Sequence, residues 1–174
     1  MNGVSHVHRG GEFAMGTLHS IFIADNPGGP MRQAFSINAV AGRGLECDRY
    51  FNGNGSFSRW PSGGRAITLI AVEAIEAIAN EHNIDLSNGR SRRNLVTRDV
   101  KLEALVDRHF TIGNVILFGS RLCAPCRYLE RLVAPGLYDA IKGRGGLRAD
   151  VIQGGTIREQ DALTVVSERR YSTA

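Results

Sequence analysis

The stretch "HFTIGNVILFG", residues 109–119, consists of two runs of β-branched and aromatic residues that meet at Gly113-Asn114. Glycine and asparagine tolerate a positive φ, so this dipeptide suits a tight turn between two antiparallel strands. The stretch therefore predicts a β-hairpin, and the rest of the chain has to supply the strands that pair with it.

Strand-like runs recur along the chain. They are "TLHSIFIA" (17–24), "QAFSINAV" (33–40), "AITLI" (66–70), "SRRNLVT" (91–97), "RADVIQ" (148–153) and "DALTVV" (161–166). In the second run, alternation predicts that Phe35, Ile37 and Ala39 share one side. The strands do not alternate regularly with helices, which favours a mainly β fold: a closed or nearly closed β-barrel with a few peripheral α-helices.

Two segments have helical spacing. In "AVEAIEAIANEHN" (71–83) the apolar residues that fall on one helix face are Val72, Ile75, Ile78 and Ala79. The segment "RYLERLVAPGLYDAIKG" (127–143) predicts one or two short helices, because Pro135-Gly136 interrupts it.

Length and composition indicate one domain. The chain has 174 residues, a size that buries a core without disulfides. Residues 1–15 lack an apolar core and periodicity and are interpreted as an N-terminal extension or cloning remnant, with the domain at 16–168 and a tail at 169–174. No run approaches the roughly 18 apolar residues of a membrane span. Three cysteines, an odd number, indicate a reducing compartment, so we expect a cytoplasmic protein.

The formal charge is +4, and the arginines gather in loops rather than in one block. This distribution suits a small anionic ligand better than nucleic acid. The glycine-rich polar stretch 42–64 is too long for a simple connection, so we expect it to be functional or mobile.

Residues 121–130, "RLCAPCRYLE", place two thiols three positions apart before a helix. Cys123 and Cys126 could form a redox disulfide, contribute to a metal site, or hold sulfur as a thiolate; either could also be a small buried apolar residue. A zinc site would need more ligands than the sequence places nearby. A thioredoxin-like site normally comes early in its sheet, whereas only two strand candidates follow here.

Seven motifs together resemble the MOSC domains, named after the C-terminal part of molybdenum-cofactor sulfurases. They are "GRGLECDRYFNG", "RAITLIAVEAIEAI", "SRRNLVT", "KLEALVDRHFTIGNVIL", "CAPCRYLE", "GRGGLRADVIQGGTI" and "QDALTV", in the family's order and spacing over nearly all of residues 16–166. The resemblance implies a β-barrel associated with the molybdenum cofactor (molybdopterin) and with pyridoxal phosphate. It also implies that Cys126 matches a cysteine proposed to hold sulfur or ligate molybdenum. We expect the helix N-terminus to lie closer to Cys123, which would favour that thiol as the reactive one. We follow the family position and assign Cys123 a supporting or resolving role.

Two positions depart from the family pattern. Cys47 stands where members usually have glycine before Asp-Arg, and it puts a third thiol in a loop that could face the site. Gln160 stands where the last motif usually has Gly-Asp, which we interpret as a turn that no longer needs a positive φ.

A phosphorylated pterin would need guanidinium forks, glycine-loop amides and a soft ligand. The candidates for cofactor binding are Arg49, Arg65, Arg92, Arg93, Asn94 and Arg144, with Cys126 as the metal ligand. Loops 42–64 and 88–94 and segment 121–127 are predicted to meet at one mouth.

Two classes of function remain open. One is a molybdenum-cofactor protein that acts either as a reductase component for N-hydroxylated substrates or as a sulfur carrier through a Cys126 persulfide. Its partners would be a separate electron donor or a cysteine desulfurase. The other is a non-catalytic binding module for a pterin or nucleotide-like anion, and a thiol-disulfide protein using "CAPC" is a further alternative.

Overall fold

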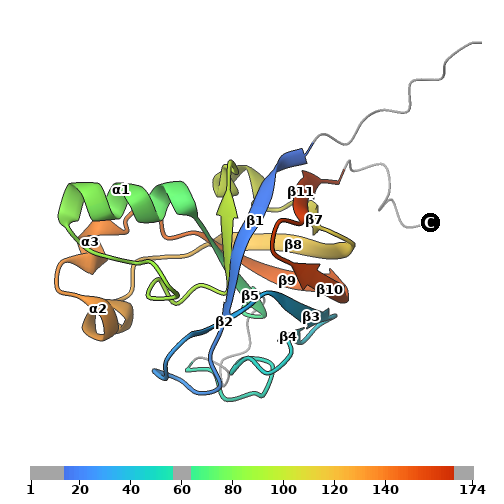
Figure 1. Ribbon diagram of the computed structural model, residues 1–174, viewed down its shortest axis with the longest axis horizontal. Helices are drawn as coiled ribbons and strands as arrows, with labels where there is room; N and C mark the ends of the chain where they lie inside the picture. The colour runs from blue at the N-terminus through green and yellow to red at the C-terminus, as the bar shows by residue number, and fades with distance from the viewer. Residues whose placement is uncertain (1–13, 57–63, 167–174) are drawn as a thin grey trace, which may run out of the picture.

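A computed structural model describes residues 14–56 and 64–166 (Figure 1). The strands are β1 (Ala14–Ile23), β2 (Arg32–Ala34), β3 (Ser36–Val40), β4 (Gly44–Leu45), β5 (Ile67–Ala71), β6 (Leu95–Arg98), β7 (His109–Ile112), β8 (Val115–Leu122), β9 (Leu147–Gln153), β10 (Gly155–Arg158) and β11 (Ala162–Val165). The helices are α1 (Val72–His82), α2 (Arg127–Val133) and α3 (Leu137–Ala140), with one 3-10 turn, η1 (Leu102–Leu105).

Seven strands close into a barrel, as predicted. The larger sheet runs β11-β7-β8-β9-β5-β6-β1, and β11 pairs with β1 to complete the ring. β5 and β6 pair in parallel, connected through α1, and the other neighbours in the ring are antiparallel. β2 extends from β1 outside the ring, and β10, β3 and β4 form a second, three-stranded sheet.

The barrel interior is the main apolar core. Strand β9 shows why: Leu147, Ala149 and Val151 are buried in this core, whereas Arg148 and Asp150 alternate with them and keep partial exposure. Successive side chains of a strand point to opposite faces of the sheet, so Arg148 and Asp150 lie on the outer face of the barrel. The barrel interior is occupied by apolar side chains, so the charged side chains that could bind an anion lie outside it.

The three α-helices lie together on one side of the barrel (Figure 1). Val72 at the start of α1 packs with Phe22, Ile70 and Val96 on the outer faces of β1, β5 and β6. A separate apolar cluster joins α1 to the helices after the cysteines, with Ile78, Ile84, Leu86, Leu129, Leu137, Ala140 and Ile141 at its centre. Among the described residues, no helix is both long and apolar enough to cross a membrane.

Several local predictions are confirmed. The hairpin turns at Gly113-Asn114 between β7 and β8, and the helical segment after the cysteines breaks at Pro135-Gly136. β1 begins at Ala14, two residues before the expected domain boundary; residues 1–13 and the predicted tail lie outside the described ranges.

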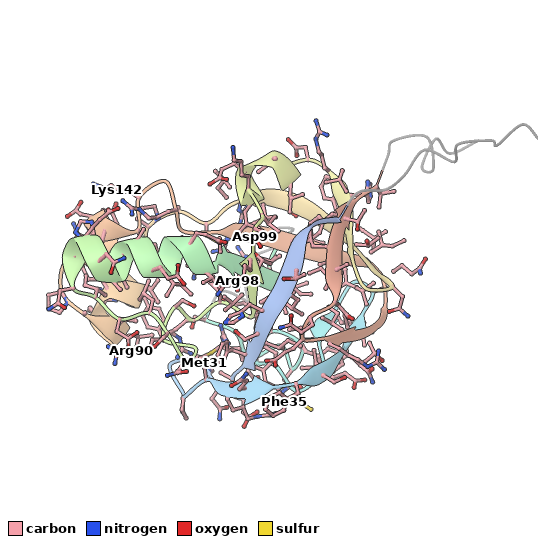
Figure 2. The ribbon with its side chains drawn as sticks, turned by 45° about the horizontal axis from the view of Figure 1, so that its top comes forward. Met31, Phe35, Arg90, Arg98, Asp99 and Lys142 are labelled. Atoms are coloured by element: carbon pink, nitrogen blue, oxygen red, sulfur yellow. The ribbon has the colours of Figure 1, made fainter. Side chains whose placement is uncertain are left out.

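Two predictions about apolar faces were wrong. Ala79 is exposed, because the face of α1 that packs inward is centred on Val72 and Ile78 and leaves position 79 on the solvent side. Phe35 is 74% exposed, because the chain bends between β2 and β3 and the alternation that buries Ile37 and Ala39 begins only after it. Figure 2 shows Phe35 at the edge of the molecule, beside these two short strands.

Candidate functional site

A small hollow lies on the outer face of the barrel, beside β5, β9 and α2. Its volume is about 80 Å³, and its polar lining consists of Arg49, Arg92, Arg93, Arg148, Cys126, Tyr50, Ser56, Thr68 and Tyr128. These residues come from the loop after β4, the segment before β6, the segment before α2 and α2 itself, together with strands β5 and β9. The predicted meeting of three loops at one mouth is therefore confirmed for their described parts; residues 57–63 lie outside the described ranges.

Arg49 is held rigidly at the wall of this hollow. Its side chain is only 8% exposed, and its Nη1 donates to Asp48 Oδ2 at 3.2 Å and to Met31 Sδ at 3.6 Å. Among the described residues no fully buried side-chain nitrogen lacks a hydrogen-bond partner. The nitrogens of Arg49 that have no partner in the described part of the chain therefore reach solvent. Because Arg49 lines the hollow, we infer that these nitrogens face it.

Asp48 and Asn94 form the foundation of the site. Asp48 is fully buried and accepts hydrogen bonds from the backbone amides of Ala24 (3.2 Å) and Tyr50 (3.0 Å) as well as from Arg49. Asn94 Nδ2 also donates to Asp48 Oδ2, at 3.2 Å. These bonds tie the arginine loop after β4 to the end of β1 and the start of β6.

The other end of the Asn94 amide binds β5. Its Oδ1 accepts from the Thr68 amide at 3.2 Å and from the Thr68 hydroxyl at 3.0 Å, while Nδ2 also donates to the Phe22 carbonyl at 3.2 Å. Asn94 is 1% exposed and does not line the hollow. The structure thus places this predicted cofactor ligand beneath the site, where it fastens three strands together.

Arg92 approaches Arg49 despite their like charges. Its backbone is left-handed, with φ 57°, and its Nη1 donates to the Gly29 carbonyl at 2.7 Å. Burial lowers the pKa of Arg92 from its usual value, and the positive charge of Arg49 lowers it further. An anion placed between the buried Arg49 guanidinium and the half-buried Arg92 guanidinium would therefore be stabilised by both charges.

Arg93 and Arg148 complete the ring of positive charge. Arg93 Nε donates to the Gly145 carbonyl at 2.9 Å, so its two terminal nitrogens remain for a ligand. It pairs with neither Asp48 nor Asp99. Arg148 lies on the outer face of β9, opposite Thr68 of β5, and its side chain has no hydrogen bond or ion pair within residues 14–56 and 64–166.

The two neighbouring cysteines have different surroundings. Cys126 lines the hollow, is half-buried, and precedes α2 as its N-cap residue without a side-chain capping bond. Cys123 is buried, its backbone amide donates to the Gly146 carbonyl at 2.8 Å, and it is absent from the lining. The expectation that the helix start lies closer to Cys123 was therefore wrong, because the helix begins directly after Cys126.

Cys126 also has a packing role. It lies partly against the apolar cluster that joins α1, α2 and α3, which includes Leu129 and Leu137. The described ranges contain no group of three histidine, cysteine or carboxylate side chains able to hold a metal ion. A metal at Cys126 would thus need most of its ligands from a cofactor or a substrate.

Two predicted arginines are not brought to the hollow. Arg65, just before β5, does not line it. Arg144 points toward α1, where its Nη2 contacts Glu81 Oε2 at 2.8 Å, and it borders a wider hollow of about 540 Å³ beside Glu73 and Asp99. Asp99, which borders this second hollow, is labelled near α1 in Figure 2. It is larger, but it lacks a thiol and mixes both charge signs, so we place the chemistry at the smaller one.

The two residues that replace the family's usual glycines, Cys47 and Gln160, both have a positive φ. Cys47 has φ 62° and Gln160 has φ 70°, both in the left-handed region. The interpretation that the turn at Gln160 no longer needs a positive φ was wrong: the turn keeps it, and glutamine adopts it at a cost in strain. Cys47 is exposed on another surface, beside Ile37 and Glu46, and does not line the hollow.

Sequence reasoning missed Arg148 and Thr68. Both occupy polar positions between buried residues of a strand, which is a visible signal for an outward-facing side chain. The pattern does not reveal that the outer faces of β5 and β9 are neighbours under the same loops. That follows from the antiparallel pairing of these two strands.

Solved structures share this fold. The YuaD protein from Bacillus subtilis superposes with a TM-score of 0.72 at 17% identity, covering 86% of this chain and 94% of that one. YiiM from Escherichia coli gives 0.64 at 17% identity, covering 87% and 70%, and YiiM from Geobacillus stearothermophilus gives 0.60 at 14%, covering 88% and 74%. At these identities the likeness establishes the fold alone. A comparison with curated proteins finds no match.

The family comparison covers most of the chain. The model of the MOSC domain matches residues 29–164, which includes the loop of Arg49, the Arg92-Arg93 pair, Cys126 and Arg148. By this match, and in agreement with the closed barrel, the chain belongs to the MOSC domain family.

Proposed function

We propose that this protein binds the molybdenum cofactor through the phosphate group and carries sulfur on Cys126. One observation supports this most directly: a half-buried thiol and four guanidinium groups line the same hollow. MOSC domains are associated with this cofactor, which combines a phosphate with a metal that prefers soft ligands. The residues around the hollow offer partners for both.

The residues around the hollow offer donors suited to the phosphate and the metal of this cofactor. Arg49, Arg92 and Arg93 are fixed by internal hydrogen bonds and keep free nitrogens, so they would hold a phosphate without a large loss of side-chain freedom. Cys126 would supply the soft sulfur. A hollow of about 80 Å³ matches a phosphate group, whereas whole drug-sized ligands occupy about 300–1,000 Å³. The lining thus fits the anionic end of the cofactor.

When bound, the cofactor would supply a metal centre for oxygen-atom or electron transfer. The chain's own contribution as a sulfur carrier is simpler. The Cys126 thiolate attacks the outer sulfur of a donor persulfide; a new S–S bond forms at Cys126, the donor's S–S bond breaks, and the donor leaves as a thiolate. The nearby guanidinium groups stabilise the negative charge that moves to the Cys126 persulfide.

The test begins with the purified protein. We expect molybdenum and pterin to co-purify or to bind on titration, and a persulfide on Cys126 to appear by peptide mass spectrometry after incubation with a persulfide donor. Pyridoxal phosphate serves as a second phosphorylated probe, because its phosphate would suit the same arginines. Cys126→Ser should abolish the persulfide while the protein stays folded.

The matched control is Cys47→Ser, which removes an exposed thiol outside the hollow. It should leave pterin binding and persulfide formation on Cys126 unchanged. Absence of both pterin binding and a Cys126 persulfide would reject the proposal. Pterin binding that is insensitive to Cys126→Ser would instead favour a non-catalytic binding module.

A further inference from the structure

We propose that the hollow admits small sulfur-bearing dianions of the thiosulfate class, and that Cys126 takes sulfane sulfur from them directly. This inference rests on the proposed role of Cys126 as a sulfur carrier, and it names the class of donor. The site would then be loaded by a small molecule, without a protein donor docking at the thiol.

The size of the hollow favours a small oxyanion. Pockets that take drug-sized ligands have about 300–1,000 Å³, and the volume of this hollow is far smaller, about 80 Å³. A tetrahedral ion of sulfur and oxygen is of this order. The tip of a protein donor's cysteine-bearing loop, with its backbone, is considerably bulkier.

The charge of the lining favours a dianion. Four arginines line the hollow, and the described lining contains no aspartate or glutamate. The nearest named carboxylate, Asp48, is fully buried and already accepts from two amides, Arg49 and Asn94. Most of the positive charge around the hollow is therefore left without an anionic partner within the described residues.

Guanidinium nitrogens of three arginines are available to bind an anion in the hollow. Arg92 and Arg93 each donate one guanidinium hydrogen bond to a backbone carbonyl, at 2.7 and 2.9 Å, and their other guanidinium nitrogens remain available to a ligand. The Arg148 guanidinium makes no hydrogen bond within the described ranges. Arg148 lies opposite Thr68, whose hydroxyl donates to Asn94 Oδ1 at 3.0 Å. Guanidinium forks pair with planar or tetrahedral oxyanions through two parallel hydrogen bonds, which a single ammonium group does not offer.

The proposed reaction explains why so much positive charge lies beside a thiol. A thiolate and thiosulfate are both negative and repel each other in water. Arginines on the walls of the hollow offset that repulsion and hold the dianion by its sulfonate oxygens, with the outer sulfur left for Cys126.

The step balances without another reactant. The Cys126 thiolate forms a bond to the outer sulfur of thiosulfate, and the S–S bond of thiosulfate breaks with its electron pair going to the sulfite that leaves. The charge is three negative units on each side: thiolate plus dianion gives persulfide anion plus sulfite dianion. No external oxidant or reductant is needed, because one S–S bond replaces another.

The first experiment measures sulfite release and persulfide formation when the full-length protein is mixed with thiosulfate. Cys126→Ser should show neither. Arg148→Gln should lower the rate about tenfold or more, since a hydrogen bond to a charged group contributes roughly ten- to a hundredfold. The matched control is Arg121→Gln: Arg121 pairs in register with Arg148 on the neighbouring strand β8, is exposed, and does not line the hollow.

A second experiment probes the charge around the thiol without any cofactor or sulfur chemistry. Iodoacetate, an anion, and iodoacetamide, its neutral analogue, alkylate the protein, and peptide mapping reads Cys126 and Cys47 separately. The iodoacetate-to-iodoacetamide rate ratio should be higher at Cys126 than at the exposed Cys47, inorganic phosphate should compete, and Arg148→Gln should reduce the ratio.

The outcomes separate this inference from the proposed function. Equal ratios at the two cysteines, or thiosulfate turnover unchanged in Arg148→Gln, would overturn the inference. A Cys126 persulfide that forms from a protein persulfide donor but not from thiosulfate would overturn it too, while leaving the proposed sulfur carrier intact. Failure with both donors, together with absence of pterin binding, would reject the proposed function itself.

Discussion

Replacing Asn94 by alanine tests the hydrogen-bonded foundation under the site. The side chain makes four hydrogen bonds: its Nδ2 donates to Asp48 and to the Phe22 carbonyl, and its Oδ1 accepts from the Thr68 amide and hydroxyl. Each such bond contributes about 1 kcal/mol net to the free energy of unfolding. We expect Asn94→Ala to lose about 4 kcal/mol of unfolding free energy.

That loss is a large part of the roughly 5–15 kcal/mol by which domains are stable. At about 2–4 °C per kcal/mol for a chain of this size, the melting temperature should fall by about 10 °C. The assay is urea unfolding at fixed pH, with the slope against urea required to stay constant. The control is Asn52→Ala, which removes an exposed asparagine whose side chain has no hydrogen bond within the described residues and should change stability by less than about 0.5 kcal/mol. A loss below about 1 kcal/mol for Asn94→Ala would refute the role assigned to this network.

The remaining predictions concern the arginines, the thiol and the strained turns. Arg93→Leu should weaken binding of a phosphorylated pterin roughly ten- to a hundredfold, with Lys recovering only part because it loses the fork; unchanged affinity on titration would remove Arg93 from the site. Cys126→Ser should keep the melting temperature within a few degrees yet abolish sulfur transfer, and full activity in this variant would make the thiol structural. Cys47→Gly and Gln160→Gly should each gain about 0.5–1 kcal/mol, because glycine adopts a positive φ without strain. Alanine at either position should give no gain, and thermal unfolding of the four variants decides whether backbone strain is the cause.

Local patterns predicted much of the architecture. The β-rich runs around Gly113-Asn114 predicted the hairpin, and helical spacing with Pro135-Gly136 predicted the helices and their break. These features depend on residues close together in the chain, so the sequence carries them in full. The misplacement of Phe35 has the same origin, since alternation cannot show where a strand bends.

The candidate site was only partly predictable. Sequence reasoning selected Arg93 and Cys126, and the structure places both at one hollow. It also selected Arg144 from the motif that contains Arg148, although Arg144 pairs with Glu81 and Arg148 lines the hollow. Neighbouring arginines in one motif have the same chemistry, and only the direction of the chain after Gly146 separates them.

By itself, the sequence determined that this chain forms a mainly β domain of the MOSC type with a thiol between arginine-rich loops, because periodicity, turn residues and motif order are properties of the linear chain. Only the tertiary structure decided that Asn94 supports the site from below, that Cys126 and not Cys123 reaches the hollow, and that Arg148 joins it. The physical reason is that these assignments depend on β5 pairing with β6 on one side and β9 on the other. Closing the barrel brings together residues separated by dozens of positions, and no local pattern records which outer faces become neighbours.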